Sequence, residues 1–192
     1  MSLKLYIQRH GEAEWGMQMD PTRELTETGK RQAKMMGKWL SRQDEHPQVV
    51  IESNFKRSIQ TAKRVADKLD VRRIRSGFLD PENSPENAWS EIKRLAQAQE
   101  AERVLIVSHG PLVEKLFCML IAAPLPNQIW FNHAAIARFH CTGGARGVLH
   151  WMVAPNTVAR DEDEMNDVVS ESKAVTEASL ALAEACVLSL PA

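Results

Sequence analysis

Two histidines, each followed directly by a glycine, stand where two predicted β-strands end. His10 follows the strand expected over residues 3–8, and His109 follows the strongly apolar strand expected over residues 103–107. Ligands of open α/β sheets bind at the carboxyl ends of the strands, so we expect the two rings to be neighbours in space. A neutral imidazole is available as a nucleophile near pH 7 because its reference pKa is about 6.5. Either histidine alone would more simply be a hydrogen-bonded structural residue, whereas the pair indicates a reactive site.

Two arginines accompany these histidines at positions that suit an anion. Arg9 directly precedes His10, and Arg57 falls in the first turn of a helix predicted over residues 56–69. A cation is poorly placed at a helix N-terminus, whose partial positive charge favours anions, and a bound anion would resolve that conflict. A planar guanidinium can bind two oxygens of a phosphoryl group at once. Arg57 is therefore either an anion ligand or a solvated surface residue.

The spacing of apolar residues predicts strands that alternate with helices. We expect strands over residues 3–8, 48–52, 71–74, 103–107, 134–140 and 147–153, and helices over residues 28–42, 56–69, 86–101 and 111–121. Thr26 suits the N-cap of the first helix, and Pro111 suits the first turn of the last one. This alternation indicates an α/β layered fold with a largely parallel sheet, which would position both histidines at one edge.

The composition indicates one globular domain without a strong field of either sign. The chain has 192 residues, 44% of them hydrophobic and 26% charged, and its formal net charge is -1. Such a charge does not favour binding to nucleic acid or to an acidic membrane, and no apolar stretch is long enough to span a bilayer. The three cysteines lie far apart in the sequence. This argues against a disulfide framework or a zinc site and favours a cytoplasmic protein.

The last part of the sequence differs from the rest. Residues 161–167 form an acidic run, and the residues beyond it have the spacing of an amphipathic helix. We expect one domain over residues 1–157, followed over residues 158–192 by an acidic linker and a C-terminal amphipathic helix. This helix would either pack back on the domain or bind a partner.

Four sequence blocks carry a resemblance to a known family. They are RHGEAE at residues 9–14, DPTRELTETGKRQA at 20–33, SNFKRSIQTA at 53–62 and VLIVSHGPLV at 104–113. In this order they resemble the histidine phosphatase superfamily, and within it the short SixA-type phosphohistidine phosphatases. The resemblance ends at about residue 157. It implies the phosphoglycerate mutase-like fold, a three-layer α/β/α arrangement around a largely parallel sheet.

The resemblance also implies a role for each matched residue. His10 would be the nucleophile that takes the phosphoryl group, and Arg9, Arg57 and His109 would bind the phosphoryl oxygens. Arg23 would be an additional phosphate ligand. Phosphoryl transfer needs positioning and charge neutralisation more than covalent help from the protein. Since the arginines can supply that charge, and no pair or cluster of metal-binding residues stands out, we expect no metal and no cofactor.

The proton supplied to the leaving group is the open part of this scheme. The carboxylates in suitable loops are Glu12, Glu14, Asp80 and Glu82, and none lies in a motif that matches securely. We rank Asp80 and Glu82 first as possible general acids because they fall between the third strand and the next helix. Each of the four is otherwise a solvated loop carboxylate. An imidazole leaving group, with a reference pKa near 6.5, demands less of an acid than an alkoxide does.

Two aromatic residues lie near these blocks. Trp15 follows the first block, and we expect it either to wall the pocket or to pack within its own loop. His133 precedes the strand expected over residues 134–140, and we interpret it as a turn residue that could also reach the rim of the site. Neither position falls in a matched motif.

These observations predict a metal-independent phosphatase that works through a phosphohistidine intermediate on His10. The expected substrate is phosphohistidine on a histidine phosphorelay or carrier protein, because the chain lacks the longer insertion that would close over a small metabolite. A phosphomonoesterase acting on a sugar phosphate or a similar metabolite is the second hypothesis. A non-catalytic phospho-binding module is the third, and it is disfavoured because mere binding does not require a nucleophile beside two arginines.

Overall fold

The computed structural model describes residues 2–122, 129–142 and 144–159. The chain divides into two compact units, Met1–Pro155 and Asn156–Ala192. Residues 156–159 of the second unit are helical. The acidic run and the amphipathic helix predicted beyond it lie outside the described residues, so that expectation stays a prediction. The sheet, its helices and the site all belong to the first unit.

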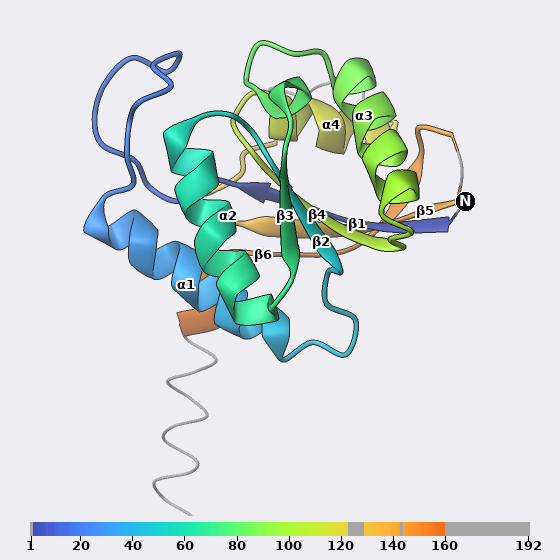
Figure 1. The fold of residues 1–192 in the computed structure, drawn as a ribbon, viewed down its shortest axis with the longest axis horizontal. Helices are drawn as coiled ribbons and strands as arrows, with labels where there is room; N and C mark the ends of the chain where they lie inside the picture. The colour runs from blue at the N-terminus through green and yellow to red at the C-terminus, as the bar shows by residue number, and fades with distance from the viewer. Residues whose placement is uncertain (1, 123–128, 143, 160–192) are drawn as a thin grey trace, which may run out of the picture. The chain divides into compact units, whose positions relative to one another are not determined.

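A six-stranded sheet forms the centre of the first unit, with the strand order β3-β2-β4-β1-β5-β6 (Figure 1). In chain order its strands are β1 Ser2–Arg9, β2 Val49–Glu52, β3 Arg72–Arg75, β4 Arg103–Ser108, β5 Ile136–Thr142 and β6 Gly147–Val153. The first four are parallel to one another, whereas β5 runs antiparallel to β1 and β6 antiparallel to β5. The predicted α/β fold with a largely parallel sheet is confirmed.

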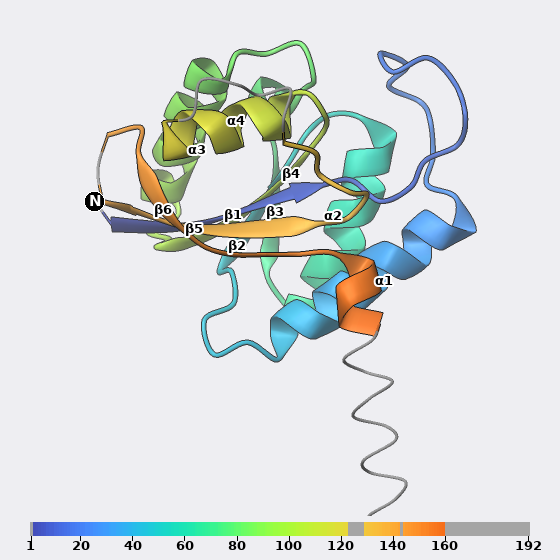
Figure 2. The same cartoon turned by 180° about the vertical axis from the view of Figure 1, so that it is seen from behind.

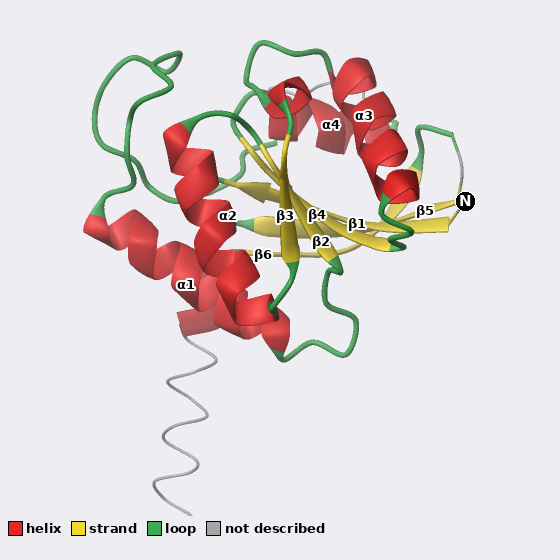
Figure 3. Cartoon of the chain, in the orientation of Figure 1, coloured by secondary structure: helices red, strands yellow, loops and turns green. Residues whose placement is uncertain are grey.

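Helices cover both faces of this sheet. They are α1 Glu27–Ser41, α2 Lys56–Leu69, α3 Pro85–Ala98 and α4 Leu112–Ile121. Figures 1 and 2, which view the chain from opposite sides, both show α3 and α4 on one side of the strands and α1 and α2 on the other. The three layers stand out when helices and strands are coloured separately (Figure 3). Within the described ranges, no helix is long and apolar enough to cross a membrane.

Strand β1 lies in the interior of the sheet and is buried on both faces. Leu5, Tyr6 and Ile7 have no exposed surface. Leu5 and Ile7 belong to the same apolar cluster as Trp89 and Ile92 of α3. Burial on both faces is typical of a central strand in a largely parallel sheet, which helices cover on either side. The residues that end β1 are therefore held by the most deeply buried part of the fold.

The helix ends agree only in part with the local sequence signals. The hydroxyl of Thr26 accepts a hydrogen bond from the backbone N–H of Gly29 at 3.0 Å, so the predicted N-cap is confirmed. Helix α3 ends at Ala98, three residues earlier than predicted. The cause is Glu100, which adopts a left-handed backbone conformation with φ 51°, so that the Ala101 N–H turns back to the Ala96 carbonyl. Pro111 is the N-cap residue of α4 rather than part of its first turn.

Candidate active site

A cavity of about 470 Å³ lies where the carboxyl ends of β1 and β4 approach the first turn of α2. Its lining includes the side chains of Arg9, His10, Arg23, Arg57, Glu114 and His133. His109 lies beside it, with its ring centroid 5.1 Å from that of His10. The structure therefore brings together the two histidines and three arginines that the sequence nominated, from segments that are far apart in the chain.

Both ring nitrogens of His10 have a partner. Nδ1 lies 2.6 Å from the carbonyl oxygen of Gly11. Because a carbonyl can only accept, Nδ1 carries the proton and Nε2 carries the lone pair. Nε2 accepts a hydrogen bond from Nε of Arg57 at 3.2 Å. Burial holds the pKa of His10 well below its ordinary value, and the nearby cations Arg57 and Arg9 act in the same direction. The ring is therefore neutral at pH 7.

The turn after β1 is packed against the first turn of α1, and this contact requires glycine. A Cβ on Gly11 would lie only 2.6 Å from the carbonyl oxygen of Gly29. The backbone N–H of Gly11 donates to the hydroxyl of Thr61 at 3.0 Å, which ties the same turn to α2. Backbone packing on two sides thus fixes the carbonyl that holds the His10 ring.

Arg57 is a buried cation that backbone oxygens hold in place. Its side chain is 1% exposed. Its two terminal nitrogens donate to the carbonyl oxygens of Asp20 and Gln18, both at 2.8 Å. Burial lowers the pKa of Arg57 to about 10, and Arg23 contributes in the same direction, so the guanidinium stays charged at pH 7. Since carbonyl partners leave the net charge in place, this group remains available to attract an anion.

Arg9, at the end of β1, is a partly buried cation that is also held by a backbone oxygen. Its Nη1 donates to the carbonyl oxygen of Phe131 at 2.6 Å, and its guanidinium lies over the ring of Trp130 at 5.0 Å. Its Nε is buried without a hydrogen-bond partner. Burial lowers the pKa of Arg9, whereas the charge of Glu114 raises it. The unpaired N–H is a donor that a bound ligand can use.

His109 is buried beside the cavity and is oriented by a serine. Its Nε2 lies 2.6 Å from the hydroxyl of Ser53, at the end of β2, while its Nδ1 is buried without a partner. Burial lowers the pKa of His109 well below its ordinary value, and the charges of His10, Arg57 and Arg9 add to this effect. The site thus contains neutral imidazoles beside arginine cations, and this arrangement can stabilise the negative charge of a phosphoryl group.

Arg23 lines the cavity from the long loop between β1 and α1. Its Nε donates to the carbonyl oxygen of Glu14 at 2.7 Å, and its Nη1 donates to that of Met17 at 3.3 Å. These bonds brace the loop whose carbonyl groups also hold Arg57. Arg23 is therefore placed to add charge to the site and to shape the rim.

The two carboxylates ranked first as general acids lie elsewhere. Both carboxylate oxygens of Asp80 accept hydrogen bonds from Asn54, one from the backbone N–H at 2.8 Å and the other from the side-chain amide at 3.0 Å. Glu82 is exposed, and neither residue is part of the cavity lining. Asp80 fastens the loop after β2 instead, because that loop presents two N–H donors to it. Their positions do not support a role as acid.

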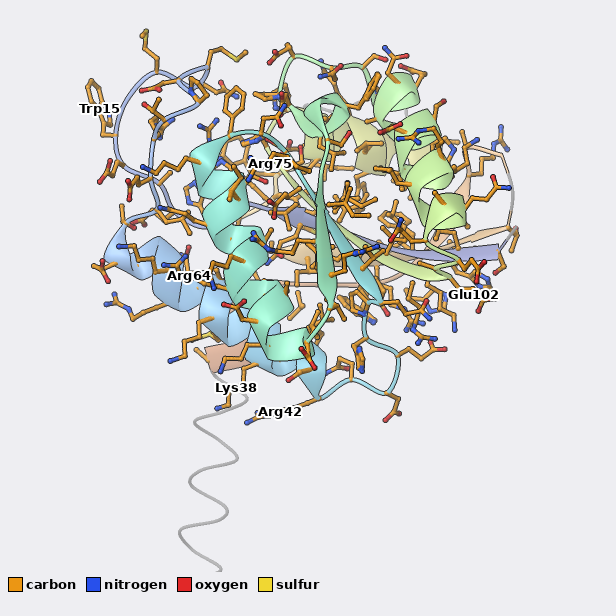
Figure 4. The ribbon with its side chains drawn as sticks, viewed as in Figure 1. Trp15, Lys38, Arg42, Arg64, Arg75 and Glu102 are labelled. Atoms are coloured by element: carbon orange, nitrogen blue, oxygen red, sulfur yellow. The ribbon has the colours of Figure 1, made fainter. Side chains whose placement is uncertain are left out.

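Sequence reasoning underrated other residues of the cavity. The ring of His133, which we interpreted first as a turn residue, lies 5.8 Å from that of His10 and lines the cavity. Trp15 does not wall it, because its side chain is fully exposed on the loop after β1 (Figure 4). Trp130 lines the cavity instead, and Glu114 was not considered. One signal could have drawn attention to Glu114, since it is the one acidic residue in the mostly apolar helix sequence LVEKLFCMLI.

Comparisons with known proteins show which family this chain resembles. The family profile of the histidine phosphatase superfamily (branch 1) matches residues 5–79. The phosphohistidine phosphatase SixA of Escherichia coli is 30% identical over 156 residues, covering 80% of this chain and 94% of that protein. Phosphoserine phosphatase 1 of Hydrogenobacter thermophilus is 26% identical over 205 residues, covering 82% and 91%.

A solved structure extends the similarity to three dimensions. The protein histidine phosphatase SixA complexed with tungstate matches with a TM-score of 0.73 and 27% sequence identity. The match covers 81% of this chain and 99% of that one. The two proteins thus share the same overall fold.

The environment of His10 leads to a prediction about its titration. Because burial and neighbouring cations disfavour the imidazolium, we expect the pKa of His10 to lie below 6.5 in the folded protein and to return to its ordinary value in urea. As the pH falls, this ring therefore takes up a proton at a higher pH in the unfolded chain than in the folded protein. The contribution of the ring to the free energy of unfolding is present above about pH 6.5 and is lost as the pH falls towards the folded pKa. Nitrogen-15 NMR of the imidazole measures both values. A folded pKa at or above the unfolded one would contradict the electrostatic description of the site.

Proposed function

The chain belongs to the histidine phosphatase superfamily and is a phosphatase, a hydrolase, and we propose that it removes the phosphoryl group from phosphohistidine on a protein, without a metal ion. The observation that carries the proposal is the state of His10. Its Nδ1 proton is held by the Gly11 carbonyl, and its Nε2 lone pair is directed at Arg57, inside a cavity with two further arginines. This is what an imidazole nucleophile for phosphoryl transfer requires.

In the first step, Nε2 of His10 attacks the phosphorus atom of the substrate. A new P–N bond forms, the bond to the leaving group breaks, and the leaving atom keeps the electron pair. Nε of Arg57, which donates to Nε2 in the free protein, transfers its hydrogen bond to a phosphoryl oxygen as the substrate enters. The free N–H of Arg9 binds a second oxygen. In the second step, water attacks the phosphorus atom, the P–N bond breaks and its electron pair returns to Nε2 of His10. The protons of the water leave with the phosphate.

The arginines take the part that a metal ion has in many other phosphoryl transfers. Arg9, Arg23 and Arg57 all line the cavity, and Arg57 reaches it as a buried charge. Donors that are fixed before the reaction stabilise developing charge without reorganisation, and removing one typically costs about a hundredfold or more in rate. His109, whose Nδ1 is unpaired, is a fourth contact for the phosphoryl group.

The leaving group argues for phosphohistidine rather than an alkyl ester. Asp80 and Glu82 do not reach the cavity, so neither is placed to protonate a departing alkoxide. Imidazole, with a reference pKa of about 6.5, departs with far less help. The Escherichia coli relative is named a phosphohistidine phosphatase, and the SixA protein of the solved structure is called a protein histidine phosphatase. Both names support the same substrate class.

A phosphomonoesterase acting on a small metabolite is the second function that a specific observation favours. The relative from Hydrogenobacter thermophilus carries the name phosphoserine phosphatase, and its match covers a similar share of this chain. In that case a cavity group other than Asp80 or Glu82 would have to supply the proton.

The two functions differ in their substrate preference. A missing general acid typically forfeits about 10²–10⁴-fold in rate, and the loss falls on leaving groups that need protonation. We therefore expect kcat/KM for a phosphohistidine peptide to exceed that for a sugar phosphate or phosphoserine by at least about a hundredfold. A panel of these substrates with nitrophenyl phosphate as an activated reference measures the ratio. Equal values, or a preference for an ester, would replace this proposal with the metabolite phosphatase.

The arginine site predicts how the enzyme responds to mutation and to chelators. Arg57→Ala should lower kcat/KM for nitrophenyl phosphate by at least about a hundredfold, because a donor to the transition-state charge is lost. Arg64→Ala, on the same helix but outside the cavity lining, is the matched control and should remain active.

The chelator EDTA should leave the rate of the wild-type enzyme unchanged, because arginines rather than a metal ion supply the positive charge. Loss of activity in EDTA that Mg²⁺ or Zn²⁺ restores would show that a metal carries the charge instead.

A further inference from the structure

One carboxylate stands in a cavity whose other charges are positive. Glu114, in the first turn of α4, is 6% exposed and is the one acidic side chain among the described residues that line the cavity. The cations around the same cavity are Arg9, Arg23, Arg57 and Lys115. A carboxylate repels a phosphoryl group, so its presence weakens a site built only to hold phosphate. Phosphate binding alone therefore does not account for its place in the cavity.

The carboxylate of Glu114 is held near the catalytic histidines. Oε1 accepts a long hydrogen bond, 3.4 Å, from the backbone N–H of Phe131. Oε2 lies 3.1 Å from the point where a Cβ on Gly110 would stand, so the glycine that follows His109 leaves the room that the carboxylate occupies. Arg9 donates to the carbonyl oxygen of the same Phe131. Glu114 and Arg9 thus hold opposite ends of one residue at the cavity wall.

The unpaired polar atoms of the site show what kind of ligand completes it. Arg9 Nε, His109 Nδ1 and Glu114 Oε2 are all buried without a hydrogen-bond partner. A phosphoryl group offers acceptor oxygens, so it can satisfy the N–H of Arg9. It cannot satisfy Glu114, whose oxygen needs a donor. A buried acceptor left unpaired is unfavourable, and a substrate that carries its own N–H can supply the missing donor.

We propose that Glu114 binds the leaving group by accepting a hydrogen bond from the second ring nitrogen of a phosphorylated imidazole. This inference rests on the proposed function, because protonated phosphohistidine has such an N–H on the nitrogen that does not carry phosphorus. Ile129 and Trp130 line the same cavity and give the planar ring an apolar wall. Aryl phosphates and sugar phosphates do not present a ring N–H at this position.

The contact has a chemical consequence for the P–N bond. A carboxylate that accepts a hydrogen bond from the second nitrogen favours the cationic form of the substrate ring, in which one nitrogen carries phosphorus and the other carries a proton. When Nε2 of His10 forms its bond to phosphorus, the P–N bond of the substrate breaks and its electron pair returns to the ring. The ring then leaves as neutral imidazole and keeps its N–H proton, which stays hydrogen-bonded to Glu114. No proton has to be delivered to the leaving nitrogen, so the reaction does not need a general acid.

The experiment compares Glu114→Gln and Glu114→Ala with wild-type enzyme on two substrates. For a phosphohistidine peptide, we expect kcat/KM to fall at least about tenfold, the scale for losing one hydrogen bond to a charged group. For nitrophenyl phosphate, which has no N–H to bind, kcat/KM should be unchanged or higher. Inorganic phosphate should inhibit the variants at least as strongly as it inhibits the wild-type enzyme, because a charge that repels phosphate is gone. Glu102→Gln, the same change of charge at the exposed start of β4, is the control and should alter neither substrate.

The possible outcomes separate this inference from the proposed function. A parallel fall on both substrates, or weaker binding of phosphate, would mean that Glu114 only supports the structure and would overturn the inference. Unchanged turnover of both would overturn it as well. Wild-type enzyme that hydrolyses nitrophenyl phosphate but not the phosphohistidine peptide would overturn the proposed function itself, and the inference with it.

Discussion

The site depends first on one hydrogen bond, from Nδ1 of His10 to the carbonyl oxygen of Gly11 at 2.6 Å. This bond determines which nitrogen holds the proton, and hence which nitrogen carries the lone pair and where it points. The carbonyl can keep its place because Gly11 lies against the backbone of Gly29, at a distance that leaves no room for a side chain. Behind it, β1 is buried on both faces and hydrogen-bonded to β4 and β5. A central strand, a glycine turn and the start of α1 together orient a single imidazole.

The second constraint is electrostatic. Burying a cation without a carboxylate partner is costly, yet Arg57 is almost fully buried and held by the carbonyl oxygens of Gln18 and Asp20. Neutral His10 and His109 beside it limit the repulsion, since two charged imidazoles would add to the positive charges of the arginines. The free protein thus holds a site that an anion completes, and the cost of assembling the cations is met by folding rather than at the moment of reaction.

The sequence predicted those parts of the site whose positions depend on local sequence patterns. His10, His109 and Arg57 follow or begin regular elements, and the periodicity of those elements is visible in the sequence, so their meeting at one edge of the sheet could be predicted. The acid candidates could not be judged, because the position of Asp80 depends on the N–H groups of Asn54 in another loop. Glu114 and His133 reach the cavity only through the packing of α4 and the segment before β5. The early end of α3 was hidden too, since Glu100 gives no sign in the sequence of its left-handed conformation.

The central claim is that His10 becomes phosphorylated during turnover, and trapping the intermediate tests it most directly. Wild-type protein mixed with excess nitrophenyl phosphate and quenched rapidly in denaturant at alkaline pH should carry one phosphoryl group, stable to base and labile to acid. Mass spectrometry of the digested protein should locate it on His10, and phosphorus NMR of the denatured enzyme should assign it to Nε2. His10→Ala protein treated in the same way should carry none. A phosphoryl group on another residue, or turnover by the wild-type enzyme with no covalent phosphate under conditions that saturate it, would contradict the account.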